Sequence, residues 1–216
     1  SRCLPFPSIS AAKMTWRGPF AVLGSLCLTS TILVGLLNAA DWEYSLYILH
    51  PVFMTVAFVS LATSSILTIR SRKSDPATRE GKAQLHGILN TLIIVCASVG
   101  YYAIYMNKEN YGASHLTSNH GWVGAVAVGL WSLQFILGGT NAMWKGAGFH
   151  DAGGAHSWTG RVSATLSTTA LLLALRKGSS VAIFGETGSL VLSVCIAAVV
   201  VAAATAAFPS KKPKTR

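Results

Sequence analysis

The stretch VLSVCIAAVVVAAATAAF, residues 191–208, decides the fold class of this chain. It contains no charged residue, and its length approaches the roughly 20 helical residues that cross the hydrocarbon layer of a bilayer. Five stretches of similar character precede it, and we predict a membrane-spanning helix for each. In chain order the six predicted spans cover about 20–40, 46–69, 85–106, 121–143, 157–175 and 189–208.

The composition of the whole chain agrees with these spans. Of its 216 residues, 51% are apolar and only 11% are charged, whereas a soluble domain has about 25% charged residues. The fifth span is the most polar, but its hydroxyl side chains can bond to their own helix or to a neighbouring one. We therefore expect an all-α membrane protein in which most of the chain contacts lipid.

The net charge of +10 could indicate nucleic-acid binding, but the basic residues lie in the links between spans, which indicates membrane orientation instead. Thirteen Lys and Arg residues fall on the side of the two termini and three on the other side. By the positive-inside rule both termini are cytoplasmic. We expect a cytoplasmic N-terminal segment (1–17), a six-helix domain (18–208) and a basic cytoplasmic tail (209–216), with no nucleic-acid partner.

The second to fifth spans each carry one histidine at the membrane entrance: His50, His86, His120 and His156. Consecutive spans run in opposite directions, so His50 and His120 share the outer face, and His86 and His156 share the inner face. The first and sixth spans carry no histidine. This pattern predicts a four-helix core of spans two to five, with the first and sixth spans at its periphery.

These histidines predict two haem sites. A single interfacial histidine is more simply a helix cap, but ionisable residues at membrane depth are costly and usually functional. Zinc usually takes four ligands that include cysteine or carboxylate, whereas two imidazoles complete the coordination of haem iron. Iron with both axial positions filled favours electron transfer over oxygen chemistry. The chain has no C-x-x-C-H motif for covalent haem attachment.

Glycines near three of the histidines leave two interpretations open. Gly87 follows His86 directly, and Gly124 and Gly160 lie four residues after His120 and His156. They make room either for a porphyrin edge or for close helix packing. We find no repeat of fixed period along the chain.

The sequence alone also leaves the function open between classes. No glycine-rich nucleotide fingerprint is present, so the electron donor is a diffusing molecule or another protein. The chain could be a transmembrane oxidoreductase or an electron-transfer subunit that serves protein or quinone partners. A small transporter without haem, with structural histidines, is the third alternative.

Four segments resemble the cytochrome b561 family: LHPVFM (49–54), KAQLHG (82–87), HLTSNHGW (115–122) and AHSWTG (155–160). The resemblance covers roughly residues 18–208 and is closest to short members that consist of the transmembrane domain alone. It implies a homodimer with two haem b groups per chain, each held by two axial histidines. It also implies that cytoplasmic ascorbate reduces the inner haem, and that ferric iron or monodehydroascorbate accepts electrons from the outer one.

Under this resemblance, several polar residues become candidate ligands for anions. Inner-face cations would gather ascorbate and haem propionates by charge pairing: Lys82 and Arg70 for ascorbate, and Arg161 for a propionate. Arg70 could instead serve only to set the orientation of the chain in the membrane. His115 is a candidate for an outer substrate or proton site, with a solvated loop histidine as the alternative. Asn90 stands where some family members carry a second histidine.

Overall fold

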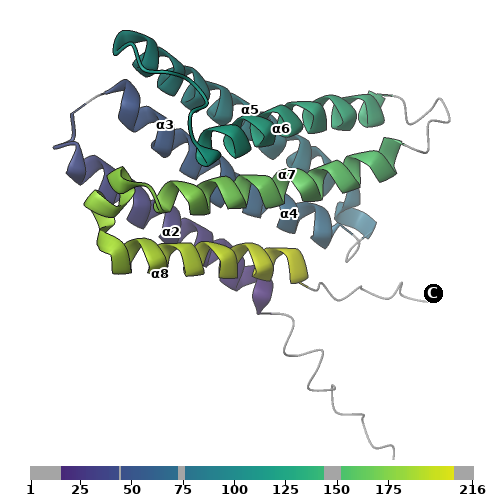
Figure 1. Ribbon diagram of the computed structural model, residues 1–216. Helices are drawn as coiled ribbons and strands as arrows, with labels where there is room; N and C mark the ends of the chain where they lie inside the picture. The colour runs from purple at the N-terminus through teal and green to yellow at the C-terminus, as the bar shows by residue number, and fades with distance from the viewer. Residues whose placement is uncertain (1–15, 44, 73–75, 144–151, 207–216) are drawn as a thin grey trace, which may run out of the picture.

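The computed structural model describes residues 16–43, 45–72, 76–143 and 152–206, and these residues form helices joined by short links, with no strand among them (Figure 1). The prediction of an all-α membrane protein is confirmed. The helices are α2 (Arg17–Ala39), α3 (Leu46–Thr55), η1 (Val56–Leu61), α4 (Ala62–Ser71), η2 (Pro76–Thr78), α5 (Arg79–Asn110), α6 (Asn119–Met143), α7 (Ala152–Leu175) and α8 (Gly178–Thr205).

Five helical stretches are long and apolar enough to cross a membrane: α2, the continuous stretch α3–η1–α4, α5, α6 up to Thr140, and α8. The fifth predicted span corresponds to α7, which lies beside α6 (Figure 1). Its average polarity is too high for it to count among the five, because hydroxyl residues are spread along it. Two of them, Ser163 and Ser167, are buried against the protein rather than exposed to lipid.

Two helices extend beyond their predicted bounds. α5 begins at Arg79 and ends at Asn110, so it carries basic and acidic residues past both ends of the predicted apolar segment. α8 begins at Gly178, eleven residues before its predicted start, and its backbone breaks at Gly185, where φ is 70°. Glycine adopts this left-handed conformation without steric cost. The predicted tail 209–216 and nearly all of segment 1–17 lie outside the described residues.

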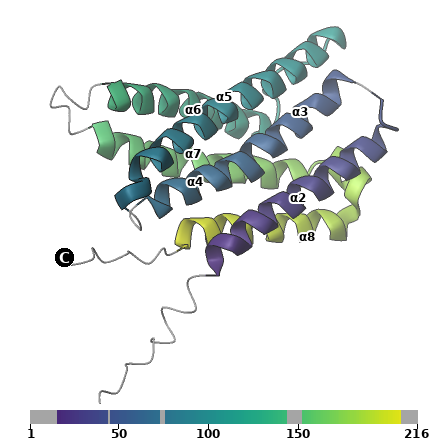
Figure 2. The same cartoon turned by 180° about the vertical axis from the view of Figure 1, so that it is seen from behind.

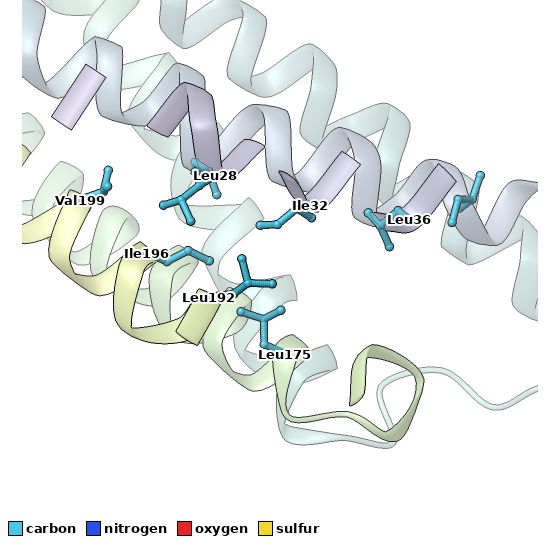
Figure 3. Close-up of a cluster of buried hydrophobic side chains, with 9 residues drawn as sticks. Leu28, Ile32, Leu36, Leu175, Leu192, Ile196 and Val199 are labelled. Carbon is cyan, nitrogen blue, oxygen red and sulfur yellow. The ribbon is translucent and has the colours of Figure 1, made fainter. Parts of the chain in front are cut away.

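The helices form a core with a flanking pair. α2 and α8 lie side by side on one flank, as both views show, and the helices with histidines form the rest of the bundle (Figures 1 and 2). A cluster of branched side chains from α2, α8, α3, η1 and α7 joins the pair to the core (Figure 3). It contains Leu28, Ile32, Leu36, Ile48, Val59, Leu175, Leu192, Ile196 and Val199.

Gly24 allows α2 and α8 to approach each other. A Cβ atom at this position would lie 2.8 Å from Cγ2 of Val199, which is buried. We predict that Gly24→Val pushes the two helices apart and destabilises the protein by about 1–3 kcal/mol, the usual cost of overpacking. The measurement is the thermal unfolding temperature of the purified protein in detergent.

The control for this prediction is Gly129→Val on α6. A Cβ atom on Gly129 meets nothing within 4 Å, so the added side chain faces open space. An equal loss of thermal stability in both variants would contradict the packing argument.

Candidate functional site

The structure brings His50 of α3 and His120 of α6 together at one end of the core, the end that the positive-inside rule predicts to be the outer one. Their ring centroids are 6.0 Å apart, and the ring planes are inclined by 80°. Two imidazoles on opposite sides of one metal ion, with bonds of about 2.0–2.1 Å, have centroids about 6 Å apart. The spacing of this outer pair therefore suits two axial ligands of one iron.

His86 of α5 and His156 of α7 form the inner pair in the same way. Their ring centroids are 6.2 Å apart, and the ring planes are inclined by 90°. Both pairs join the same helices that the sequence analysis paired. Within the described residues, neither pair is completed by a third His, Cys, Asp or Glu into a metal-binding group.

The outer imidazoles are held by main-chain carbonyls of the neighbouring helix. His50 Nδ1 lies 3.0 Å from the carbonyl oxygen of Gly100, and His120 Nδ1 lies 2.9 Å from that of Ala170. A carbonyl can only accept a hydrogen bond, so Nδ1 carries the proton in each ring. The lone pair is then on Nε2, which is the arrangement that metal-bound histidines adopt.

The inner imidazoles are held by polar side chains as well. His86 Nδ1 lies 2.8 Å from the Ser65 hydroxyl and 3.2 Å from the Ser65 carbonyl oxygen. The Asn90 amide donates to the Ser65 hydroxyl at 2.8 Å and to the His86 carbonyl at 2.7 Å. Asn90 therefore supports His86 through hydrogen bonds at the position where some family members carry a second histidine.

Gln134 of α6 holds the main chain of the fourth histidine. Its amide donates to the His156 carbonyl at 2.7 Å, and its oxygen accepts from the Thr159 hydroxyl at 2.5 Å. The Gln134 amide nitrogen also lies 3.3 Å from His156 Nε2, while His156 Nδ1 is buried without a partner among the described residues. Gln134 is itself buried, and the sequence analysis did not identify it.

The four histidines repeat one geometric unit twice. The stretch Leu46–Ser71 forms a first helical hairpin with α5, and α6 forms a second with α7. His50 and His86 are 36 residues apart, as are His120 and His156. Each outer histidine bonds to a carbonyl 50 residues later in its own hairpin. Each hairpin thus supplies one imidazole to each end.

The π-helix η1 keeps this repeat in phase. Fourteen residues separate the outer from the inner position on three helices: Gly100 from His86, His120 from Gln134, and Ala170 from His156. Fifteen separate His50 from Ser65. The extra residue lies in a stretch that contains Val56–Leu61, whose wider turn absorbs it. Such π-turns occur frequently at functional sites, and here Ser65 faces His86 as a result.

A cavity of about 630 Å³ opens beside the outer pair and contains small side chains among its walls. Gly124 lies on this wall, and a Cβ atom there would meet nothing within 4 Å, which favours the interpretation that it makes room for a porphyrin. Gly160 instead packs tightly, because its Cβ would lie 2.7 Å from the Gln134 amide. Gly87 is exposed, with open space around it.

The predicted anion-binding residues lie at both ends of the bundle. The Arg70 guanidinium donates to the Ala206 carbonyl from Nε at 3.2 Å and from Nη2 at 3.0 Å. Lys82 donates to the Ser71 carbonyl at 3.0 Å. Arg161 is exposed on α7 and lies 3.4 Å from the Ser157 hydroxyl.

Arg72 is a further cation at this end of the bundle. It lies close enough to His86 to act on it electrostatically, and its Nε is buried without a partner among the described residues.

At the outer end, His115 lines the same cavity as His50 and His120. Its Nε2 lies 2.7 Å from Glu109 Oε1, and its ring stacks on Tyr105 at a centroid distance of 4.6 Å. Lys108 and Lys177 also line the cavity. In the sequence these two lysines served only to assign the orientation. Their positions near the ends of α5 and α7, both of which carry a histidine, could have indicated that they lie beside the outer histidine pair.

The residues present fit b-type haem. Both imidazole pairs have the spacing of axial ligands, three of the four rings have Nδ1 bonded to a carbonyl, and the outer pair borders a cavity with a glycine wall. Fold and site together define a class: a multi-pass membrane protein with the geometry of a transmembrane b-type cytochrome.

The sequence profile of the family described as "Eukaryotic cytochrome b561" matches residues 49–182, which is more than half of the chain and includes all four histidines. The chain belongs to the cytochrome b561 family, and membership implies b-type haem.

Similar proteins include the transmembrane reductase CYB561D2 of Homo sapiens, 34% identical over 102 residues that make up 46% of each chain. A probable ascorbate-specific transmembrane electron transporter 2 of Oryza sativa subsp. japonica is 30% identical, over 57% of this chain and 52% of that protein. The transmembrane ascorbate-dependent reductase CYB561 of Ovis aries is 31% identical, over 50% of this chain and 42% of that protein. The matched part spans about half the length of these relatives.

The π-helix leads to a prediction about deletions. Removal of Leu61 takes out the extra residue, so η1 converts to α-helix while His50 and Ser65 continue to face the core. Removal of Val126 from α6 rotates Gln134 by about 100° relative to His120, since an α-helix has 3.6 residues per turn. We predict that the Leu61 deletion retains bound haem and that the Val126 deletion loses inner-site haem, measured as haem per purified chain.

Val126 is a suitable comparison because its side chain is half exposed, so its deletion removes little buried surface. Equal haem loss in both deletions would show that η1 does not correct the phase of the helix.

Proposed function

We propose that this protein transfers electrons across a membrane from cytoplasmic ascorbate, through two b haems, to ferric iron or monodehydroascorbate on the other side. The names of its relatives, which include ascorbate-dependent reductases and ascorbate-specific electron transporters, support ascorbate as the donor. An oxidoreductase that acts across the membrane is the function that this geometry supports best.

The observation that carries the proposal is that the two imidazole pairs lie at opposite ends of one four-helix core. Fourteen helical residues between the two levels correspond to about 21 Å at 1.5 Å per residue. The hydrocarbon layer is about 30 Å thick. Each pair therefore lies a short distance inside one surface of the layer, within reach of a substrate that stays in water.

The residues of the chain have distinct tasks in this proposal. His86 and His156 hold the inner haem, and His50 and His120 hold the outer haem. When bound, each haem supplies an iron that changes between the ferrous and ferric states. With two imidazoles from the chain on each iron, no position would be left for oxygen or water, so the haem would carry electrons rather than activate oxygen. The carbonyl bonds keep the outer rings in the orientation that binding requires.

Cations at each end attract the anionic reactants. Lys82 and Arg70 lie at the inner end, together with Arg72, and ascorbate binds among them as an anion by charge pairing. Arg161 pairs with a haem propionate. At the outer end, Lys108 and Lys177 border the cavity that His115 also lines. His115 binds the electron acceptor there or exchanges a proton with it. The protein works as a homodimer, as the family resemblance implies. Both termini are cytoplasmic, as the distribution of basic residues indicates.

The histidine pairing gives the first test of this function. We predict that His86→Ala and His156→Ala each abolish the inner haem, and that His50→Ala and His120→Ala each abolish the outer one, because each site would then keep only one of the two imidazoles that would hold the haem. Two quantities are measured on the purified protein: the number of haems per chain, and the absorption band of the reduced haem. A crossed pattern, in which His50 groups with His86, or a colourless wild-type protein would contradict the proposal.

Vesicles separate the proposed function from its alternatives. We predict that vesicles loaded with ascorbate and containing only this protein reduce an external ferric chelate, and that His50→Ala vesicles do not. The measurement is the rate of ferrous-complex absorbance. Both haems without chelate reduction, restored by an added protein partner or quinone, would instead indicate an electron-transfer subunit. Colourless protein that moves solutes would indicate a transporter.

A further inference from the structure

Two aromatic side chains lie between the level of the outer imidazole pair and the level of the inner pair. Phe58 from η1 and Trp131 from α6 have ring centroids 6.0 Å apart and ring planes inclined by 38°. Both side chains are buried, Trp131 at 4% exposure and Phe58 at 8%. The buried residues around them are aliphatic and mostly small: Ala57, Ala62, Ile93 and Ala97.

Trp131 reaches from the inner level toward the outer one. Its backbone lies three residues before Gln134, which holds His156. Side chains on a helix lean toward its N-terminus, and the N-terminus of α6 is its outer end. The indole Nε1–H donates to the Ser167 hydroxyl at 2.7 Å. Ser167 lies three residues before Ala170, whose carbonyl holds His120.

Phe58 continues this path to the outer site. It lines the cavity that contains His50 and His120, and its ring contacts Trp131 on the other side. One end of the aromatic pair therefore borders the outer site, and the other end is attached within one helical turn of a residue that supports the inner site. Phe58 lies eight residues after His50 and seven before Ser65, near the middle of the roughly 21 Å interval, and Trp131 begins nearer the inner level.

We propose that Phe58 and Trp131 form the medium through which electrons pass between the two haem sites; this inference rests on the proposed function. One electron leaves the ferrous iron of the inner site, which becomes ferric, and reduces the ferric iron of the outer site to ferrous. Neither ring is oxidised. Electrons tunnel more readily through bonded, polarisable π-systems than through gaps between aliphatic side chains, so the rings increase the coupling of the two sites. The Ser167 bond fixes the indole orientation.

The decisive variant is Trp131→Leu, which keeps an apolar side chain but removes the ring. After rapid one-electron reduction of purified protein, we expect electron equilibration between the two haems to slow several-fold. Haem per chain and both midpoint potentials should stay at wild-type values, whereas damage to the fold would change them. Trp131→Phe keeps a ring without the N–H and should show an intermediate rate.

Trp122→Leu is the matched control, because Trp122 lies on the same helix but is 58% exposed. Its equilibration rate should equal that of the wild type. An unchanged rate in Trp131→Leu with both haems bound would overturn the proposal. If Trp131→Leu loses a haem, Trp131→Phe and Phe58→Leu take its place, and wild-type rates in both of these would overturn the proposal equally.

Fluorescence gives a readout that does not depend on electron transfer. The emission that Trp131→Phe removes, measured by difference during haem titration, should be quenched when haem binds. If emission from Trp131 persists in protein that holds both haems, the indole lies away from both haems and the proposal is overturned. Failure of the proposed function is distinguishable, because vesicles with wild-type protein and internal ascorbate would then not reduce the external ferric chelate, whereas the equilibration rate is measured on purified protein without either substrate.

Discussion

The structure depends on the hydrogen bond from an imidazole Nδ1–H to a main-chain carbonyl of the antiparallel neighbour in the same hairpin. A buried imidazole without such a partner is costly where no water is available. A helical carbonyl already accepts one hydrogen bond, but its second lone pair can accept another. The residues that accept are Gly100, Ala170 and Ser65, and their small side chains leave space for a ring to reach the backbone. The main chain of a neighbouring helix therefore orients three of the four imidazoles.

The two ends of the core differ in how this is achieved. The outer rings bond only to main-chain carbonyls. The inner rings also lie among the polar side chains of Ser65, Asn90 and Gln134. Hydrogen bonds to a ligating imidazole change its basicity and thereby the potential of the metal that it holds. The same repeated hairpin can in this way give two chemically distinct sites. The difference comes from a few polar side chains on α4, α5 and α6.

Much of this arrangement could be predicted from the sequence. The apolar stretches indicated helices across a membrane, and one histidine per span, with alternating direction, paired His50 with His120 and His86 with His156. The hairpin repeat is also present in the sequence, because 36 residues separate the histidines in each half, although we did not predict it. The carbonyl partners could not be predicted, since any residue has a carbonyl. Nor could η1, because an added residue in an apolar run leaves no compositional signal.

α7 shows why average polarity is a poor guide to a helix of this kind. Its hydroxyl residues lower its hydropathy, yet they occupy defined positions: Thr159 donates to Gln134, and Ser167 accepts from Trp131. Thr165 and Thr169, which are exposed, donate to carbonyls four residues earlier in their own helix, so lipid meets no unpaired hydroxyl at these positions. A purely apolar α7 would have a higher mean hydropathy but would lose its hydrogen bonds with Gln134 and Trp131 of α6. The polarity of this helix is therefore a consequence of the sites that it helps to build.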